Sequence, residues 1–355
     1  MWTEILEQYR GKNVLVTGHT GFKGSWLCMI LKMYGANVTG YSLEPDTKPS
    51  LFELAHIAEG MNSVIGDVRD LEHLESVFDE AKPEYVFHLA AQPIVRESYK
   101  YPVDTYSTNV MGTVNVLECV RHSDTVKSVL NVTTDKVYLN SEQHKGYVEE
   151  DKLDGYDPYS NSKSCSELVT HSYYNSFLKE KGIRVSTARA GNVIGGGDFE
   201  KDRIIPDCVR AVLSGEQIIV RNPHSVRPYQ HVIEPLMVYL MIAQKQSEDE
   251  KYQGAYNVGP DEENCWTTGD LVDCFCKVWG EGVSWGNQNQ GGPHEAGLLI
   301  LDCTKLKNTF CWKPQWDIKT SVENVVEWTK SYQFGCDVRK VMEWQVERYM
   351  EKAEG

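Results

Sequence analysis

The chain has 355 residues, 41% of them hydrophobic and 25% charged, which is typical of a globular protein with a large buried core. Its formal net charge of −15 at pH 7 argues against nucleic acid or an anionic membrane as the main partner. No apolar run reaches the roughly 18 residues of a membrane span, and residues 1–4 do not open a signal peptide, so we expect a cytoplasmic protein.

The ten cysteines are scattered along the chain. No C-x-x-C pair and no Cys/His cluster with zinc spacing occurs. We therefore expect reduced, mostly packed cysteines and no metal site.

A glycine-rich turn stands near the start of the chain. Residues 13–17 have the length and the Val/Leu/Thr content of a buried parallel strand, and glycines with the spacing G-x-x-G-x-x-G follow, before apolar residues at helical spacing. Glycine lets the backbone turn tightly and approach a pyrophosphate, which the N–H groups of the helix start then bind. An ordinary strand–helix turn without a ligand is the alternative, which this context disfavours. The predicted dinucleotide-binding residues here are Gly18, Thr20, Gly21, Phe22, Lys23 and Gly24.

Further strands and helices alternate down the chain. We predict strands over residues 36–42, 63–65, 85–89, 128–133 and 184–189, and a helix that opens at Asn109. This rhythm predicts an α/β fold, a Rossmann-type doubly wound parallel sheet. We expect an NAD-binding domain at residues 1–190, with returning segments near 228–260. A smaller C-terminal α/β substrate-binding lobe is expected at residues 191–355.

The strand ends supply the rest of the predicted cofactor site. Ser42 stands where dinucleotide folds usually carry an acid for the adenosine ribose, and a serine accepts only one weak neutral hydrogen bond. We therefore expect loose cofactor binding, and NAD rather than NADP because no arginine stands nearby for a 2′-phosphate. Asp67 is a candidate for the adenine amino group or, alternatively, the cap of a helix from Leu71. The other predicted cofactor residues are Val68, Leu89, Ala90, Ala91, Asn109, Tyr159 and Lys163.

Beyond residue 190 the pattern becomes less regular. We expect a glycine loop at residues 195–198 and a Gly/Asn/Gln-rich loop at residues 286–297. A helix that starts at Pro206 is predicted, as is one that Gly280 terminates. The predicted helices cover residues 206–213, 234–244, 268–279, 322–328 and 338–349, and short strands cover residues 218–220 and 230–233.

Two polar clusters follow the predicted sheet. Thr134, Asp135 and Lys136 leave the fifth strand, and Tyr159 and Lys163 open a helix. Tyr and Lys at positions i and i+4 share one helix face, so the ammonium group lies close to the phenol. A positive neighbour lowers the pKa of a tyrosine, which would make Tyr159 a base at neutral pH. An exposed helix pair is the alternative, which the upstream glycine pattern and Thr134 disfavour.

These motifs resemble the extended short-chain dehydrogenase/reductases over residues 11–330. The most specific stretches, residues 18–26, 134–136, 156–163, 190–198 and 221–232, are similar to the members that dehydrate nucleotide-linked sugars. The resemblance implies NAD as the cofactor, CDP-glucose as the substrate, and a homodimer, or a dimer of dimers, built on helices near residues 109–119 and 159–177. It also implies that Tyr159 takes the proton of the sugar 4-hydroxyl while hydride leaves carbon 4. Water is then eliminated across carbons 5 and 6, and hydride returns to carbon 6.

The elimination needs an acid for the 6-hydroxyl and a base for carbon 5. Related dTDP-glucose dehydratases carry an Asp-Glu pair where this chain has Asp135-Lys136. The resemblance makes Asp135 the acid, kept protonated by a dry pocket. Lys136 is either a neutral base or a charged group that stabilises the enolate oxygen. The alternative is a surface lysine with no role in the reaction.

The substrate site is predicted from polar residues outside the glycine turn. Guanidinium groups bind phosphate in a fork, so arginines are candidates for the diphosphate, although each could instead pair with a nearby aspartate. The resemblance adds Asn192 as a contact for the phosphate or the sugar. The predicted substrate-binding residues are Gln92, Asn192, Arg203, Arg221 and Arg227.

Two other functions remain open. A nucleotide-sugar 4-epimerase uses the same Tyr, Lys and Thr set but needs no acid for a 6-hydroxyl, so Asp135 argues against it. A non-catalytic dinucleotide-binding regulator has no need of a tuned phenol, so Tyr159 and Lys163 argue against that function.

Overall fold

The computed structural model describes residues 2–141, 143, 145–280, 282–288 and 298–354 and contains a central seven-stranded parallel sheet. The strand order is β11-β6-β5-β4-β1-β2-β3, so the chain winds outward in both directions from β1 and β4. The predicted doubly wound parallel sheet is therefore confirmed. Its strands are β1 (Asn13–Thr17), β2 (Asn37–Ser42), β3 (Asn62–Ile65), β4 (Tyr85–His88), β5 (Ser128–Thr134), β6 (Arg184–Ala190) and β11 (Ala255–Val258).

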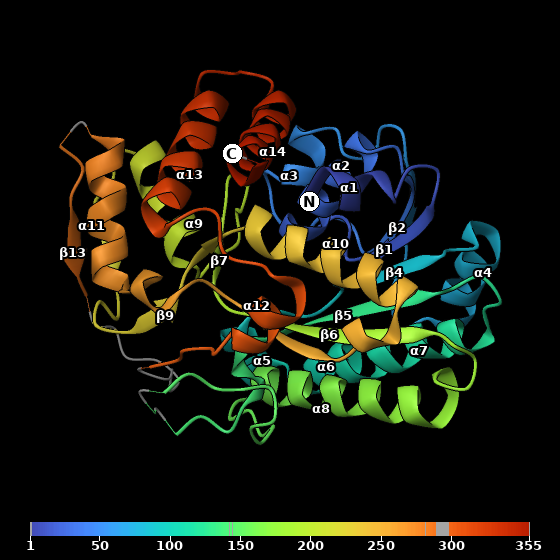
Figure 1. Ribbon diagram of the computed structural model, residues 1–355. Coiled ribbons are helices and arrows are strands. Elements are labelled where there is room, and N and C mark those ends of the chain that lie inside the picture. The colour runs from blue at the N-terminus through green and yellow to red at the C-terminus, as the bar shows by residue number, and fades with distance from the viewer. Residues whose placement is uncertain (1, 142, 144, 281, 289–297, 355) are drawn as a thin grey trace.

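Helices cover both faces of this sheet (Figure 1). On one face lie α1 (Trp2–Glu7), α2 (Phe22–Met33), α10 (Ile233–Glu248) and α14 (Val338–Glu354). On the other lie α4 (Leu71–Ala81), α7 (Gly112–His122), α8 (Pro158–Tyr173) and the π-helical turn η3 (Tyr174–Leu178). Successive strand residues point to opposite faces, so Val14 and Val16 join the first core and Leu15 joins the second. Burial on both sides explains the continuous apolar strands.

A third core holds a smaller set of elements together at one side of the sheet (Figure 1). It is built from Ile205, Ile218, Phe275 and Val322, among others. The elements in this region are β7 (Val193–Ile194), α9 (Ile204–Leu213), β8 (Ile218–Val220), β9 (Val226–Pro228), β10 (Gln230–His231), β12 (Cys265–Thr267), α11 (Thr268–Trp279), β13 (Trp285–Asn287) and α13 (Ile318–Gln333). The domain boundary at residue 190 stays a prediction, and α14 packs its buried side chains into the core of the main sheet.

Short helices complete the described chain. They are α3 (Leu51–Leu54), α5 (Val95–Lys100), α6 (Pro102–Tyr106), α12 (Thr304–Phe310), the π-helical turn η1 (Ser107–Met111) and the 3₁₀ turns η2 (Asp135–Val137), η4 (Glu250–Tyr252) and η5 (Glu262–Asn264). Among all the residues that the structure describes, no helix is both long enough and apolar enough to cross a lipid bilayer.

The six predicted strands of the main sheet begin and end within one residue of their predicted bounds, whereas β11 was not predicted. Several helices run further than predicted: α10 ends at residue 248 rather than 244, α13 covers residues 318–333 rather than 322–328, and α14 ends at residue 354 rather than 349. The helix predicted to open at Asn109 begins at Pro102 and runs through α6, η1 and α7, so Asn109 lies inside it. The first turns escaped prediction because they show no buried apolar stripe: Val103, for example, is 80% exposed.

Other differences are small. Asp70 rather than Asp67 caps α4, accepting a hydrogen bond from the His73 N–H at 3.1 Å, so the alternative role of Asp67 as a cap is wrong. Helix α9 starts two residues before Pro206, whose missing N–H has no helical partner in a first turn. The strand predicted over residues 230–233 ends at residue 231. Strand β13 replaces the start of the predicted 286–297 loop, and residues 289–297 lie outside the described residues.

Candidate active site

A large cavity of about 1210 Å³ opens at the carboxyl ends of the central strands. Gly18 follows β1, Ser42 ends β2, Leu89 follows β4, Thr134 ends β5 and Ala190 ends β6, and all five line the cavity. The cavity continues between the sheet and the smaller set of elements, where α9 and β8 contribute to its wall. This is the edge at which open α/β sheets bind ligands, because the chain reverses its winding direction there.

The glycine turn fits a dinucleotide. Gly18 has a φ of +76°, and a Cβ there would lie 2.7 Å from the Ala90 nitrogen, while a Cβ at Gly24 would collide with the Gly18 carbonyl oxygen. At Gly21 the nearest protein atom to a Cβ is 3.5 Å away, and the position borders the cavity. Protein packing therefore does not require glycine at position 21, whereas close approach of a ligand does. Helix α2 starts there without a side-chain cap, so its first N–H groups are free for a pyrophosphate.

Ser42 is already hydrogen-bonded within the chain. The Thr20 hydroxyl donates to the Leu43 carbonyl at 2.8 Å and lies 2.9 Å from the Ser42 hydroxyl, which must then be the donor in that contact. Ser42 thus has lone pairs but no proton to offer a ribose. This agrees with the expectation of a single weak acceptor at the end of β2.

Replacing Ser42 with aspartate is expected to tighten NAD binding by roughly 3- to 30-fold, because a carboxylate accepts stronger hydrogen bonds from two ribose hydroxyls. The measurement is a fluorescence titration of the full chain with NAD. The matched control, Ser42→Asn, offers a neutral acceptor of the same size and should change the Kd far less. An aspartate variant with unchanged Kd would contradict the ribose role.

Thr134, Asp135 and Lys136 form a linked series at the end of β5. The Thr134 hydroxyl donates to Asp135 Oδ1 at 2.9 Å, and the Lys136 ammonium lies 3.5 Å from the same oxygen. Asp135 is fully buried, and its Oδ2 has no hydrogen-bond partner within the described chain. Because buried polar atoms in proteins are nearly always partnered, Oδ2 is a candidate to act on a ligand.

Tyr159 and Lys163 are both buried in the first turns of α8. Burial raises the pKa of Tyr159 to about 12, and a hydrogen bond with Thr134 acts against this shift. The net pKa of Tyr159 in the chain alone is therefore raised rather than lowered, because burial outweighs the effect of neighbouring positive charge. Both groups are desolvated: burial lowers the pKa of Lys163 to about 8, and its ammonium donates to the Val132 carbonyl at 3.0 Å.

A buried ion pair supports this helix from behind. Glu167, one turn beyond Lys163 on α8, accepts hydrogen bonds from Thr133 (2.5 Å), Thr187 (2.7 Å) and Arg189 (2.9 Å). It therefore ties α8 to both β5 and β6. Its negative charge also acts against the loss of the Lys163 proton. Breaking such a buried pair is costly, so the network holds the Thr134–Lys136 and Tyr159–Lys163 clusters in register.

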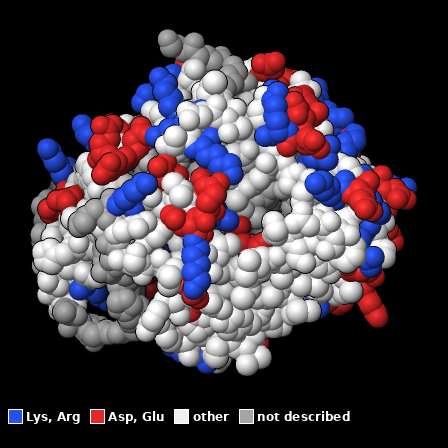
Figure 2. Space-filling view, turned by 60° about the horizontal axis from the view of Figure 1, so that its bottom comes forward, with Lys and Arg blue, Asp and Glu red and all other residues white. Residues whose placement is uncertain are grey.

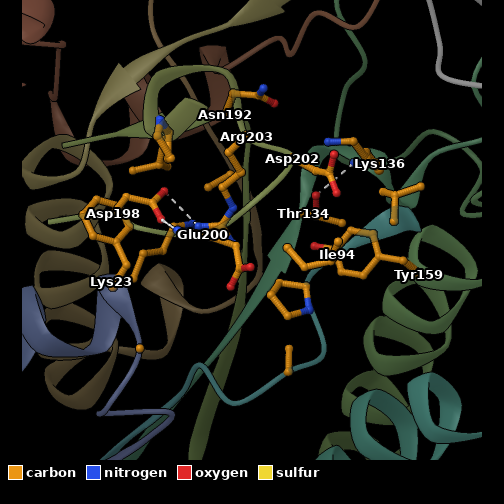
Figure 3. Close-up of a pocket in the computed structure, with 18 of the residues that line it drawn as sticks. Lys23, Ile94, Thr134, Lys136, Tyr159, Asn192, Asp198, Glu200, Asp202 and Arg203 are labelled. Atoms are coloured by element: carbon orange, nitrogen blue, oxygen red, sulfur yellow. Dashed lines mark hydrogen bonds and ion pairs between the residues drawn. The ribbon is translucent and has the colours of Figure 1, made fainter. Parts of the chain in front are cut away.

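The predicted phosphate-binding arginines line the cavity and are partnered inside it. Arg203 contacts Asp198 at 2.9 Å, Arg221 contacts Asp202 at 2.5 Å, and Arg227 donates to the carbonyl of the preceding residue at 2.8 Å. Figure 3 shows Arg203 and Asp198 on one side of the cavity and Thr134 and Tyr159 on the other. The alternative of pairing with aspartate is thus confirmed for Arg203 and Arg221, and neither is thereby removed from the cavity wall.

All but two of the residues predicted for cofactor, substrate or catalysis line the cavity; the two are Gln92 and Asn109. The Asn109 amide donates to the Gln92 carbonyl at 3.0 Å and to Ser162 at 2.9 Å. The Gln92 side chain accepts from the Ile94 N–H at 2.6 Å and donates to Thr105 at 3.1 Å. This geometry does not support the predicted contact of Gln92 with substrate or that of Asn109 with cofactor. Both side-chain amides instead form hydrogen bonds that hold the loop after β4.

A known protein family matches most of this chain. The profile described as GDP-mannose 4,6 dehydratase matches residues 15–325. The chain belongs to this family. Its place among the extended short-chain dehydrogenase/reductases, expected from the motifs, is confirmed with it.

Individual relatives refine this comparison. The chain is 46% identical over 348 residues to the CDP-glucose 4,6-dehydratase of Salmonella typhimurium, covering 96% of this chain and 97% of that protein. It is 28% identical to a probable dTDP-glucose 4,6-dehydratase of Sinorhizobium fredii, over 89% of this chain and 92% of that protein.

Solved structures of low sequence identity share the fold. A dTDP-glucose 4,6-dehydratase from Bacillus anthracis in complex with NAD has a TM-score of 0.76 at 22% identity, covering 92% of this chain and 99% of that one. A UDP-glucose 4-epimerase from Thermotoga maritima has a TM-score of 0.79 at 22% identity, over 90% and 99% of the two chains. Dehydratases and epimerases thus share one architecture, so the fold does not separate them.

Sequence reasoning missed three residues in this member of the GDP-mannose 4,6 dehydratase family. Glu167 continues the helical series of Tyr159 and Lys163 by one turn, a spacing that could have revealed it. Arg96 and Asp202 line the cavity from α5 and from the loop before α9. Arg96 carried a weaker signal, an arginine in the first turn of a helix that follows a strand end.

Proposed function

We propose that this chain converts CDP-glucose to CDP-4-keto-6-deoxyglucose and water with NAD as its cofactor. The observation that carries this proposal is the buried Asp135 carboxyl beside Thr134 and Tyr159, in a chain so similar to the Salmonella enzyme. A cytoplasmic location belongs to the same proposal. So does the division into an NAD-binding part at residues 1–190 and a nucleotide-sugar-binding lobe at residues 191–355.

The cofactor fits the residues at the strand ends. NAD held there would supply the acceptor for the hydride of carbon 4 and its donor to carbon 6, so the reaction would be redox-neutral. Gly18, Gly21 and the start of α2 bind the pyrophosphate, and Ser42 accepts from the adenosine ribose. Asp67 faces the adenine end of the cavity, where it is paired with Arg69 at 2.6 Å.

Tyr159 carries out the first proton transfer. Its phenolate accepts the proton of the sugar 4-hydroxyl, and Thr134 hydrogen-bonds the same oxygen. The pKa of Lys163 is about 8, so its ammonium is still mostly charged at neutral pH and stabilises the phenolate. The positive charge of the oxidised nicotinamide ring adds to this effect, which offsets the burial that raises the pKa of Tyr159.

Asp135 and Lys136 act together in the elimination. The two groups lie 3.5 Å apart, and the proposed elimination starts with one proton on this pair. With the proton on Asp135, the neutral Lys136 removes the hydrogen from carbon 5 and Asp135 protonates the departing 6-hydroxyl. The pair ends as ammonium and carboxylate, and water leaves across carbons 5 and 6. As hydride reaches carbon 6, the Lys136 ammonium returns its proton to carbon 5, and the proton taken from the 4-hydroxyl restores Asp135, so protons balance over the cycle.

A substrate deuterated at carbon 4 tests the proposal. A 4,6-dehydratase is expected to deliver the deuterium to carbon 6 of the same sugar, which NMR and mass spectrometry of the product detect. An epimerase leaves the label on carbon 4, and a dinucleotide-binding regulator gives no product. Either of these two results would refute the dehydratase function.

The homodimer is also part of this proposal, carried by an exposed apolar face on the helices beneath the sheet. Figure 2, which turns this side of the molecule forward, shows a broad area there with few charged residues. The exposed residues include Tyr101 (58%), Val103 (80%), Met111 (50%), Leu168 (56%) and Phe177 (43%). Contiguous apolar patches of this kind mark protein interfaces, and helices of two copies can pair across it.

Light scattering is expected to give twice the chain mass of 40.4 kDa. Changing Val103 to aspartate should shift the mass to that of one chain, because a buried unpaired charge disfavours the interface. The matched control is Phe334→Asp, since Phe334 is 79% exposed at the end of α13 and lies away from this face. A monomeric unaltered chain, or a Val103 variant that stays dimeric, would contradict the assignment.

A further inference from the structure

Two arginines from distant parts of the chain meet on one carboxylate in the cavity wall. Arg96 stands in the first turn of α5, and its Nη1 lies 3.9 Å from Asp202 Oδ1. Arg221 follows β8, and its Nη1 lies 2.5 Å from the same oxygen. All three residues line the cavity, so the contact joins the loop after β4 to the smaller set of elements.

The arginines have more donor capacity than this contact uses. Arg96 Nε is buried and has no hydrogen-bond partner within the described chain. The second Arg221 nitrogen lies 3.8 Å from Asp207, beyond hydrogen-bond distance. The local charge therefore favours an anion with several acceptor oxygens.

Asp202 is poorly suited to be a permanent partner. Its backbone φ is +62°, a left-handed conformation that non-glycine residues rarely adopt. Its side chain is 36% exposed, in a loop between β7 and α9. Because this side chain is partly exposed and stands in a loop, it can turn away from the arginines without disturbing a buried core.

We infer that Asp202 occupies the place of a phosphate group between Arg96 and Arg221, and that the substrate diphosphate displaces it. Arg96 is thereby a further substrate-binding residue, and the Asp202 carboxylate competes with the diphosphate for the two arginines. Carboxylate and phosphate present similar oxygen pairs to a guanidinium fork, and a diphosphate supplies acceptors for the unused Arg96 and Arg221 nitrogens. The inference rests on the proposed function for the nature of the ligand.

Binding of CDP and of cytidine to the full chain saturated with NAD tests this exchange, with titration calorimetry as the measurement. Arg96→Gln is expected to weaken CDP binding by roughly 10- to 100-fold, the effect of losing hydrogen bonds to a charged group, and to leave cytidine binding unchanged. Arg96→Lys, which keeps the charge but loses the fork, should lie between. Asp202→Asn should tighten CDP binding severalfold, because the competing charge is removed.

Lys100→Gln is the matched control, since it removes the same charge from the same helix outside the cavity lining, and it should change the Kd for CDP less than threefold. The inference is overturned if Arg96→Gln binds CDP as tightly as the unaltered chain. It is also overturned if Asp202→Asn weakens CDP binding, because Asp202 would then orient the arginines rather than compete. If the unaltered chain transfers deuterium to carbon 6 but these variants do not change CDP binding as expected, only this inference is refuted. If it binds no CDP at all, the proposed substrate falls with it.

Discussion

Replacing Tyr159 with phenylalanine is expected to lower kcat by roughly 10²- to 10⁴-fold, the range that a positioned general base contributes. The side chain is buried in α8 and differs from phenylalanine only by its hydroxyl, so the fold and the cavity remain. Without the phenolate, the group that accepts the 4-hydroxyl proton in the proposed reaction is gone. The Kd of CDP should stay within about threefold, because the arginines bind the diphosphate elsewhere in the cavity.

The matched control for this variant lies on the same helix. Tyr173 ends α8, and its hydroxyl donates to Glu118 at 3.2 Å, away from the cavity. Tyr173→Phe should keep more than half of the activity. Steady-state rates at saturating CDP-glucose, with CDP binding measured separately, distinguish lost chemistry from lost binding. A Tyr159→Phe enzyme with normal turnover would remove the phenol from the mechanism.

The parts of the fold that local patterns specify were predictable. The Gly18 turn, the strands and the shared face of Tyr159 and Lys163 follow from spacings of two, three and four residues, which sterics and helix geometry translate directly into structure. The cavity brings those residues together as expected. Pairings across the chain, such as Arg221 with Asp202, could only be named as alternatives, because sequence spacing does not say which of several acids lies nearest.

The errors came from effects that depend on tertiary burial. The pKa of Tyr159 was expected to fall, yet desolvation by the surrounding core raises it to about 12. Gln92 and Asn109 have side chains suited to a ligand, but the same amide groups serve equally well to hold a loop. Glu167 shows a mixed case: its spacing places it on the helix face of Tyr159 and Lys163, but its hydrogen bonds to two strands exist only once the sheet is assembled.

Replacing Asp135 with asparagine is expected to lower the rate of water elimination by roughly 10²- to 10⁴-fold while oxidation at carbon 4 continues. Asparagine has the same shape and keeps an oxygen in the place of Oδ1 to accept from Thr134. Because Oδ2 has no partner within the described chain, its replacement by an amide breaks no hydrogen bond, so the variant should fold. What it loses is the proton for the departing 6-hydroxyl.

The two variants should therefore stop the reaction at different points. Borohydride added to a reaction of the Asp135→Asn enzyme should trap a 4-ketosugar that still carries its 6-hydroxyl, as a mixture of gluco and galacto products, whereas the Tyr159→Phe enzyme should yield none. Asp154→Asn is the control, because Asp154 is an exposed partner of Lys152 outside the cavity lining, and its turnover should be normal. If the Asp135 variant still forms the 6-deoxysugar at the normal rate, the acid lies elsewhere and the shared proton of Asp135 and Lys136 is refuted. Absence of the trapped ketone, with turnover lost, would instead assign Asp135 to the oxidation step through its contact with Thr134.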